Sequence, residues 1–176
     1  MTTADPAIRL LTSSDAASYR DIRLDGLRKN PEAFASTLED EQENPLDWFA
    51  QRIAQACILG AFIAQELVGV AGLRVHDDAK QRHKATLWGM YVRREARQYG
   101  IGERLIAAVV AHAGGHVEQL QLAVVTENEA ARRLYAKAGF IEYGHQIRAL
   151  KQNDRYHDDI LMVKFLDPLA PVRVAK

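Results

Sequence analysis

The segment Arg97-Gln98-Tyr99-Gly100-Ile101-Gly102 leads directly into an apolar helical pattern that begins at Glu103. Before it, residues 85–92 are rich in bulky and β-branched side chains and are expected to form a strand. The order is therefore strand, basic loop with two glycines, and helix. Glycine allows a ligand to approach the backbone closely, and the first N–H groups of a helix have no partner within it. Together with the charge of Arg97, this start of a helix predicts a site for a phosphate or pyrophosphate group.

The two glycines alone also fit a simpler role, whereas two familiar phosphate-binding loops do not fit this segment. A tight turn that starts a helix needs no ligand and is the simpler interpretation of the glycines by themselves. A Walker A loop is excluded because Gly-Lys-Ser and Gly-Lys-Thr do not occur in the sequence. A dinucleotide-binding loop is excluded because its third glycine is replaced by Leu105.

The chain after this helix continues with a strand and another helix. Residues 119–125 alternate apolar and polar side chains, which is typical of a strand with one buried face. Thr126 and Glu129 have the spacing of a capping box at a helix start. Gly139 is placed for a left-handed C-cap, and Phe140 for the apolar contact of a Schellman motif. The apolar residues of the predicted helix share one face, namely Ala131, Leu134, Tyr135 and Ala138.

This arrangement resembles the GNAT superfamily of N-acetyltransferases, whose motif is Arg-x-x-Gly-x-Gly. Asn128, Tyr135 and Gly139-Phe140 follow in the order of the family's second motif, and residues 157–164 are similar to its closing strand. The resemblance extends over roughly residues 8–165 and is strongest from 85 to 140. Residues 27–34 are similar, less specifically, to a helix end and loop of one branch of the family.

The resemblance implies an α/β (α+β) fold with a mixed, largely antiparallel sheet of about seven strands. Helices would cover both faces, and the glycine helix would lie in a central parallel, right-handed β-α-β crossover. The two strands around that helix would splay apart, and the pantetheine arm of acetyl-CoA would enter the gap. With 176 residues, we expect a single domain over 1–176, with a core at about 7–166 and short flexible ends.

The remaining elements are predicted from local patterns. Strands are expected at 8–11, 58–64, 67–75, 141–150 and 159–165. The second and third of these would form a hairpin that turns near Gln65-Glu66. Helices are expected at 15–30, stopped by Pro31, and from Pro45 onward, capped by Asn44. Residues 34–43 are expected to form a solvated acidic loop, and 76–84 a polar loop.

The resemblance also places acetyl-CoA on particular residues. The backbones of Met90, Tyr91 and Val92 would pair with the pantetheine arm like an added strand, while their side chains fill a buried strand. The pyrophosphate would be bound by the glycine loop and the start of its helix, that is by Arg97, Gln98, Tyr99, Gly100, Ile101, Gly102 and Glu103.

Two further residues are assigned by the resemblance. Asn128 would donate a hydrogen bond to the cofactor arm, although asparagine is also an ordinary helix-start residue. Tyr135 would protonate the departing CoA thiolate, although an aromatic residue on the apolar face of this helix is also an ordinary core residue.

The general base is not identified by the sequence. Many relatives carry a glutamate on the strand before the glycine loop, but residues 86–92 contain no carboxylate. Glu39, Glu41, Glu43, His76 and His83 are candidates that would act through water. Each of them alone is more simply interpreted as a solvated surface residue.

Composition limits the classes of function. The formal net charge is +0, which argues against a broad nucleic-acid surface. No segment is typical of a signal peptide or a membrane span, so a cytoplasmic location is expected. The single cysteine, Cys57, excludes an intrachain disulfide and has no nucleophile signature. No metal is expected, because His112 and His116 are separated by Gly114-Gly115, which should break their helix.

The sequence therefore predicts an acetyl-CoA-dependent N-acetyltransferase that modifies a primary amine of a small molecule or peptide by direct attack. A non-catalytic acyl-CoA-binding or sensing module, and an enzyme that uses another acyl-CoA, are alternatives. The acidic segment 39–43 hints at a cationic acceptor. A homodimer is a further possibility, with Trp48, Phe49 and the C-terminal tail as its contact surface.

Overall fold

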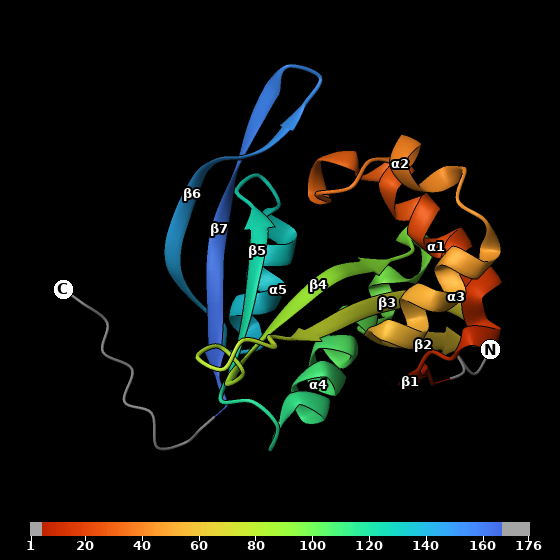
Figure 1. Ribbon diagram of the computed structural model, residues 1–176, viewed down its shortest axis with the longest axis horizontal. Coiled ribbons are helices and arrows are strands. Elements are labelled where there is room, and N and C mark those ends of the chain that lie inside the picture. Colours follow the sequence, from red (N-terminus) through yellow and green to blue (C-terminus); the bar gives the residue numbers. More distant parts are fainter. Residues whose placement is uncertain (1–4, 167–176) are drawn as a thin grey trace.

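Seven strands form one mixed sheet in the computed structural model, which describes residues 5–166 (Figure 1). The strands lie in the order β1-β2-β3-β4-β5-β7-β6. Their bounds are β1 (Ala7–Leu10), β2 (Cys57–Ile63), β3 (Glu66–Val75), β4 (Lys84–Val92), β5 (Gln119–Val125), β6 (Ile141–Gln152) and β7 (Arg155–Phe165). All neighbouring pairs are antiparallel except β4 and β5. The predicted fold class is confirmed.

Helices cover both faces of the sheet, as predicted (Figure 1). They are α1 (Ala16–Lys29), α2 (Leu38–Gln42), α3 (Leu46–Gln55), α4 (Ile101–Ala113) and α5 (Glu129–Lys137). On one face, α1 and α3 bury Ile22 and Phe49 against Val70 of β3. On the other, α4 and α5 bury Leu105 and Tyr135 in a second core. Each such side chain contributes about 1.5–3 kcal/mol when fully removed from water.

The gap implied by the resemblance is present between β4 and β5. Their parallel pairing joins only Lys84, Ala85 and Thr86 to Gln119–Gln121. Beyond these residues β4 and β5 no longer pair with each other, although each still pairs with its other neighbour. Gly89 has a φ of +59°, and the pairing of β4 with β3 shifts register near it. A bulge of this kind bends and twists its strand. The bulge therefore accounts for the divergence of β4 from β5 that is visible in Figure 1.

The turn after α5 matches its prediction. Gly139 adopts a φ of +89°, and its N–H donates to the Ala136 carbonyl at 3.0 Å. The Phe140 N–H donates to the Tyr135 carbonyl at 3.0 Å, and the two rings are 5.8 Å apart. These are the hydrogen bonds and the apolar contact of a Schellman motif.

Two predicted helix starts are wrong. The Asn128 side chain, and not that of Thr126, caps α5 by accepting from the Ala131 N–H at 3.2 Å. The Thr126 hydroxyl instead donates to the Asp158 carbonyl of β7 at 2.9 Å, so a tertiary contact replaces the local cap. Before α3, the N-cap is Pro45 and not Asn44, whose side-chain amide donates to the carbonyl of Asp40.

Both hairpins also differ from the expected boundaries. Ala64 and Gln65 have φ values of 46° and 71°, so the β2–β3 turn lies one residue earlier than predicted. The β6–β7 hairpin turns at Asn153-Asp154 and is longer than the pattern indicated. Its tip extends beyond the remaining sheet in Figure 1. Positive φ at both turn residues suits the right-handed twist of the strands.

The surface predictions are partly corrected. Residues 34–43 are not a plain loop, because they contain α2. Phe49 is fully buried against Tyr19 and Trp48, so it cannot form a dimer contact. The C-terminal tail expected at that contact, and most of the expected flexible ends, lie outside the described residues. Within residues 5–166, no helix is long and apolar enough to cross a membrane.

Candidate active site

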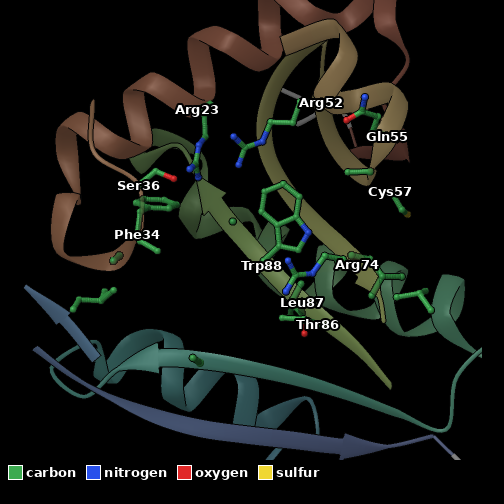
Figure 2. A pocket seen from close by; sticks show the side chains of 18 of the residues that line it. Arg23, Phe34, Ser36, Arg52, Gln55, Cys57, Arg74, Thr86, Leu87 and Trp88 are labelled. Atoms are coloured by element: carbon green, nitrogen blue, oxygen red, sulfur yellow. The ribbon is translucent and has the colours of Figure 1, made fainter. Parts of the chain in front are cut away.

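Two cavities open along the gap between β4 and β5. The smaller cavity, of about 480 Å³, is lined by the loop after α1, the end of β4, and the starts of α4 and α5. The larger cavity, of about 960 Å³, is lined by α3, β3, β4 and residues of β5, β6 and β7 (Figure 2). Ala33, Phe34 and Val125 line both cavities. The two cavities therefore meet beside the end of β5.

Most of the predicted cofactor residues come together in the smaller cavity. Those that line it are Met90, Tyr91, Val92, Arg97, Gly100, Gly102, Glu103, Asn128 and Tyr135. Ile101 does not, because its side chain is fully buried in the core. Tyr99 is 44% exposed and also lies outside the lining. Gln98 belongs to the 3₁₀ turn Arg94–Tyr99 that precedes the glycines.

The start of α4 has the geometry of an anion site. Gly100 adopts a left-handed φ of 67°, which turns the chain from the 3₁₀ segment into the helix. The N–H groups of Ile101, Gly102 and Glu103 are in the first turn, where no carbonyl of the same helix can accept from them. These groups and the positive end of the helix dipole can bind a phosphate without any side chain.

Gly102 also lies close to α5. A Cβ at this position would lie 2.9 Å from Leu134 Cδ2, so the end of that leucine side chain would have to shift. A substitution at Gly102 therefore affects the contact between α4 and α5 as well as any ligand.

Arg97 is held beside the cavity by its backbone neighbours. Its Nε donates to the Val92 carbonyl at 3.0 Å, and a terminal nitrogen lies 3.4 Å from Asn30 Oδ1. The guanidinium is 5.8 Å from the centre of the Tyr91 ring. A fixed positive charge thus lies between the end of β4 and the start of α4.

The β5-facing edge of β4 is open beyond Thr86. Because β5 has diverged there, no strand within residues 5–166 pairs with the backbone of β4 on that side between Leu87 and Val92. Such an edge can accept an extended ligand as if it were another strand. The side chain of Tyr91 has a separate structural contact, since its hydroxyl donates to Asp25 Oδ2 at 2.8 Å. Burial and this partner raise the pKa of Tyr91 to about 12.

Tyr135 presents a phenol to the smaller cavity from α5. Its hydroxyl lies 3.5 Å from Met90 Sδ, a weak acceptor on β4. Burial raises the pKa of Tyr135 to about 12. The phenol is therefore protonated at neutral pH and is available as a proton donor.

The five candidate bases lie in different surroundings, and the prediction of a solvated Glu41 is wrong. Its carboxylate is 2% exposed and accepts two hydrogen bonds from Arg23, at 2.7 and 2.9 Å. Burial opposes its ionisation, but the contacts with Arg23 and the charge of Arg52 outweigh burial and lower the pKa of Glu41. An ion-paired carboxylate of low pKa is a poor base.

The other four candidates are absent from the linings of both cavities. Glu39 and Glu43 are exposed. His76 Nε2 lies 2.9 Å from the Thr86 hydroxyl, and His83 lies in the turn before β4.

Asp159 is a buried carboxylate that the sequence patterns did not single out. It lies on β7 opposite Val125 and lines the larger cavity. Its Oδ1 is buried and has no hydrogen-bond partner among the described residues. Burial, together with the charges of Asp158 and Glu127, raises the pKa of Asp159. In the sequence it is only one of two adjacent acidic residues directly before the apolar run 160–163.

Neither a nucleophile nor a metal cluster is evident at the gap. Cys57 is half-buried in the wall of the larger cavity, and burial raises the pKa of its thiol. The helix that carries His112 ends at Ala113, as the glycines predicted, so His116 lies outside it. Within residues 5–166, no three potential ligands are grouped to hold a metal ion.

Comparisons with known proteins agree on the fold. Residues 21–140 match the acetyltransferase (GNAT) family. Among curated proteins, none matches the sequence significantly. A GNAT-family acetyltransferase of Streptococcus pneumoniae is 23% identical, with a TM-score of 0.81 over 92% of this chain and 99% of that one.

Two other solved structures are similar. A putative acetyltransferase of Salmonella typhimurium, solved with its cofactor acetyl-CoA, is 19% identical with a TM-score of 0.80, covering 95% of this chain and 97% of that one. A ribosomal-protein-alanine N-acetyltransferase of Brucella melitensis is 26% identical with a TM-score of 0.76, covering 91% and 99%.

Proposed function

The chain belongs to the acetyltransferase (GNAT) family, and we propose that it transfers the acetyl group of acetyl-CoA to a primary amine of a small molecule or peptide. The observation that carries this proposal is the smaller cavity. It runs from the glycine turn at the start of α4, along the open edge of β4, to the buried phenol of Tyr135. The residues that we assign to the phosphate, to the extended arm and to proton donation thus line one cavity.

The residues around this cavity fit acetyl-CoA. The first-turn amides of α4, with Arg97, suit the pyrophosphate. The open edge from Met90 to Val92 suits the amide-bearing pantetheine arm. The Oδ1 atom of Asn128 is occupied by the cap of α5, but its Nδ2 group makes no hydrogen bond to another described residue and can donate to that arm. Bound there, acetyl-CoA supplies an acyl group activated as a thioester.

Tyr135 is proposed as the general acid. A thiolate has an ordinary pKa of about 8.5, so it is a better leaving group if a proton donor meets it as charge develops. The phenol of Tyr135 keeps its proton at neutral pH, because burial raises its pKa to about 12. Its place in the lining of the smaller cavity, with its hydroxyl beside Met90 of β4, suits protonation of a departing sulfur.

The amine is proposed to attack the thioester directly. A covalent route requires an activated nucleophile, and the only cysteine has a thiol pKa raised by burial. Catalysis would then come mainly from holding amine and thioester together where the two cavities meet.

Two measurements test the proposal. Acetyl-CoA at one hundred times its dissociation constant should stabilise the folded protein by about 2.7 kcal/mol, whereas NADH and ATP, which lack pantetheine, should do much less. Release of CoA thiol should depend on an added amine, assayed over panels of amines, amino acids and peptides with acetyl-CoA and longer acyl-CoAs. Equal stabilisation by all three ligands would indicate a generic phosphate site and contradict the proposal.

A further inference from the structure

The larger cavity lies on the far side of the junction from the proposed cofactor site. It shares Ala33, Phe34 and Val125 with the smaller cavity, so the two cavities adjoin at these residues. Its volume of about 960 Å³ is that of a small-molecule site. The side chains around it show which kind of acceptor it suits.

Guanidinium groups gather in the larger cavity, whose lining also includes the carboxylates of Asp77 and Asp159. Arg23 and Arg52 both contact the single carboxylate of Glu41, Arg23 through two short hydrogen bonds and Arg52 at 3.4 Å. Two guanidinium groups therefore share one carboxylate. Arg74 adds a third guanidinium, and Figure 2 shows the three around Trp88 in the cavity.

Arg52 is the guanidinium best placed to bind a ligand. Its charge centre lies 5.0 Å from the ring of Trp48 and 5.1 Å from that of Trp88, which together fix its position. Its side chain is 24% exposed, whereas Arg23 is buried and committed to Glu41. Its polar contacts are one long hydrogen bond to Glu41 and an interaction with the Tyr19 hydroxyl, and a guanidinium has five N–H donors, so further N–H groups can donate to a carboxylate.

The larger cavity is also lined by Asp159. This side chain is 9% exposed, lines the cavity and has no hydrogen-bond partner for Oδ1 among the described residues. The nearby ionisable groups are Asp158 and His157 on β7 and Glu127 after β5, and burial and the two carboxylates raise the pKa of Asp159. A buried carboxylate without a partner lowers the stability of the fold, and a cationic group bound beside it removes this loss.

We propose that the larger cavity binds the acceptor as an amino acid or a similar small amine bearing a carboxylate, with the carboxylate at Arg52 and the amine at Asp159. This inference rests on the proposed acetyl transfer. Asp159 takes one proton from the ammonium group and passes it to solvent. The neutral nitrogen forms the C–N bond, and the C–S bond breaks. The thiolate takes the phenol proton of Tyr135. The nitrogen loses its second proton to solvent, and Tyr135 regains a proton from solvent.

The acceptor class is tested by matched pairs of substrates. CoA thiol release is measured for the standard amino acids and for their carboxamides, which keep the amine but lose the carboxylate. We expect kcat/KM to be about 10-fold to 100-fold higher for the best acid than for its amide, because a hydrogen bond to a charged group contributes about 1.5–3 kcal/mol. Amides, simple amines or peptides acetylated as fast as the acids would overturn the acceptor class and leave acetyl transfer standing. If wild type acetylates no amine, both proposals are wrong.

Arg52→Gln locates the carboxylate site. It should raise KM for the acid toward that of the amide and leave the KM for acetyl-CoA unchanged. Arg28→Gln, on the exposed side of α1, is the matched control and should change neither. Unchanged discrimination between acid and amide in a folded Arg52→Gln variant would refute the assignment.

Asp159→Asn tests the proton acceptor. The variant removes a buried, unpaired charge, so its melting temperature should equal or exceed that of wild type, whereas a structural carboxylate would show a loss. Its kcat should fall by about 10²-fold or more, and the rise of kcat/KM with pH through the raised pKa of Asp159 should disappear. Asp154→Asn, at a carboxylate that is 95% exposed in the turn between β6 and β7, is the control and should change neither. Full turnover in Asp159→Asn would show that this residue is not the base.

Discussion

Replacement of Tyr135 by phenylalanine separates an acetyltransferase from a protein that only binds acyl-CoA. The described contact of the hydroxyl is with Met90 Sδ at 3.5 Å, so its loss should cost less than about 1 kcal/mol. In a chain of this length, that corresponds to a melting-temperature change of no more than about 2–4 °C. The aromatic ring, which packs on Phe140, is retained. As general acid, however, the phenol should contribute about 10²-fold to 10⁴-fold to turnover.

The assay compares kcat for CoA thiol release, the acetyl-CoA affinity by calorimetry, and the melting temperature. Tyr135→Phe should lower only kcat, and Tyr143→Phe, at a tyrosine that is 53% exposed on β6, should lower none of them. Because a proton donor fails only when it ionises, and the pKa of Tyr135 is about 12, wild type should show no loss of turnover due to Tyr135 up to about pH 10. Full turnover in Tyr135→Phe would refute the catalytic role, even if the fold and cofactor are right.

Three further predictions concern other parts of the chain. Arg97→Ala should weaken acetyl-CoA binding more at low salt than at high salt, because the lost interaction is ionic, and calorimetry at two salt concentrations measures this; equal losses at both would contradict it. Glu41→Gln leaves two guanidinium groups without their carboxylate and should lower the free energy of unfolding by about 3–5 kcal/mol in urea, whereas exposed Glu43→Gln should change it by less than about 0.5 kcal/mol. Gly139→Ala places a side chain at a φ of +89° and should cost about 1–2 kcal/mol; no loss in urea unfolding would show that the turn tolerates it.

Sequence patterns predicted correctly those turns and helix ends that depend only on residues close together in the chain. The Schellman turn after α5 depends only on Gly139, Phe140 and the last turn of the helix, and all of these are adjacent in the sequence. The break of the helix at Gly114 is equally local. Elements of this kind follow from backbone conformations that few residues can adopt.

Features that depend on tertiary contacts could not be predicted in this way. Glu41 is 18 residues from Arg23 in the chain, so its burial and ion pair were invisible in an acidic segment. Thr126 is a good capping residue, but a carbonyl of β7 takes its hydroxyl, and Asn128 caps α5 instead.

Gly102 shows the same limit at the candidate site. The sequence motif indicates only a role for Gly102 in phosphate binding, but a Cβ at this position would also lie 2.9 Å from Leu134 Cδ2 of α5. Gly102→Val therefore changes packing as well as the phosphate site, and Arg97→Ala is the clearer test of binding. Asp159 could not be recognised from its own strand, because only the three-dimensional sheet brings β7 to the gap beside β4.

The central claim, direct acetyl transfer to an amine, is tested most directly by acetyl-CoA labelled on its acetyl group. The labelled compound is incubated with the protein and the amine panel, and mass spectrometry then locates the label. The label is predicted on the amine nitrogen, in amounts equal to the CoA thiol released, with none bound covalently to the protein. Tight binding of acetyl-CoA without labelling of any amine would contradict the claim and favour a binding module, and label retained on the protein would contradict direct attack.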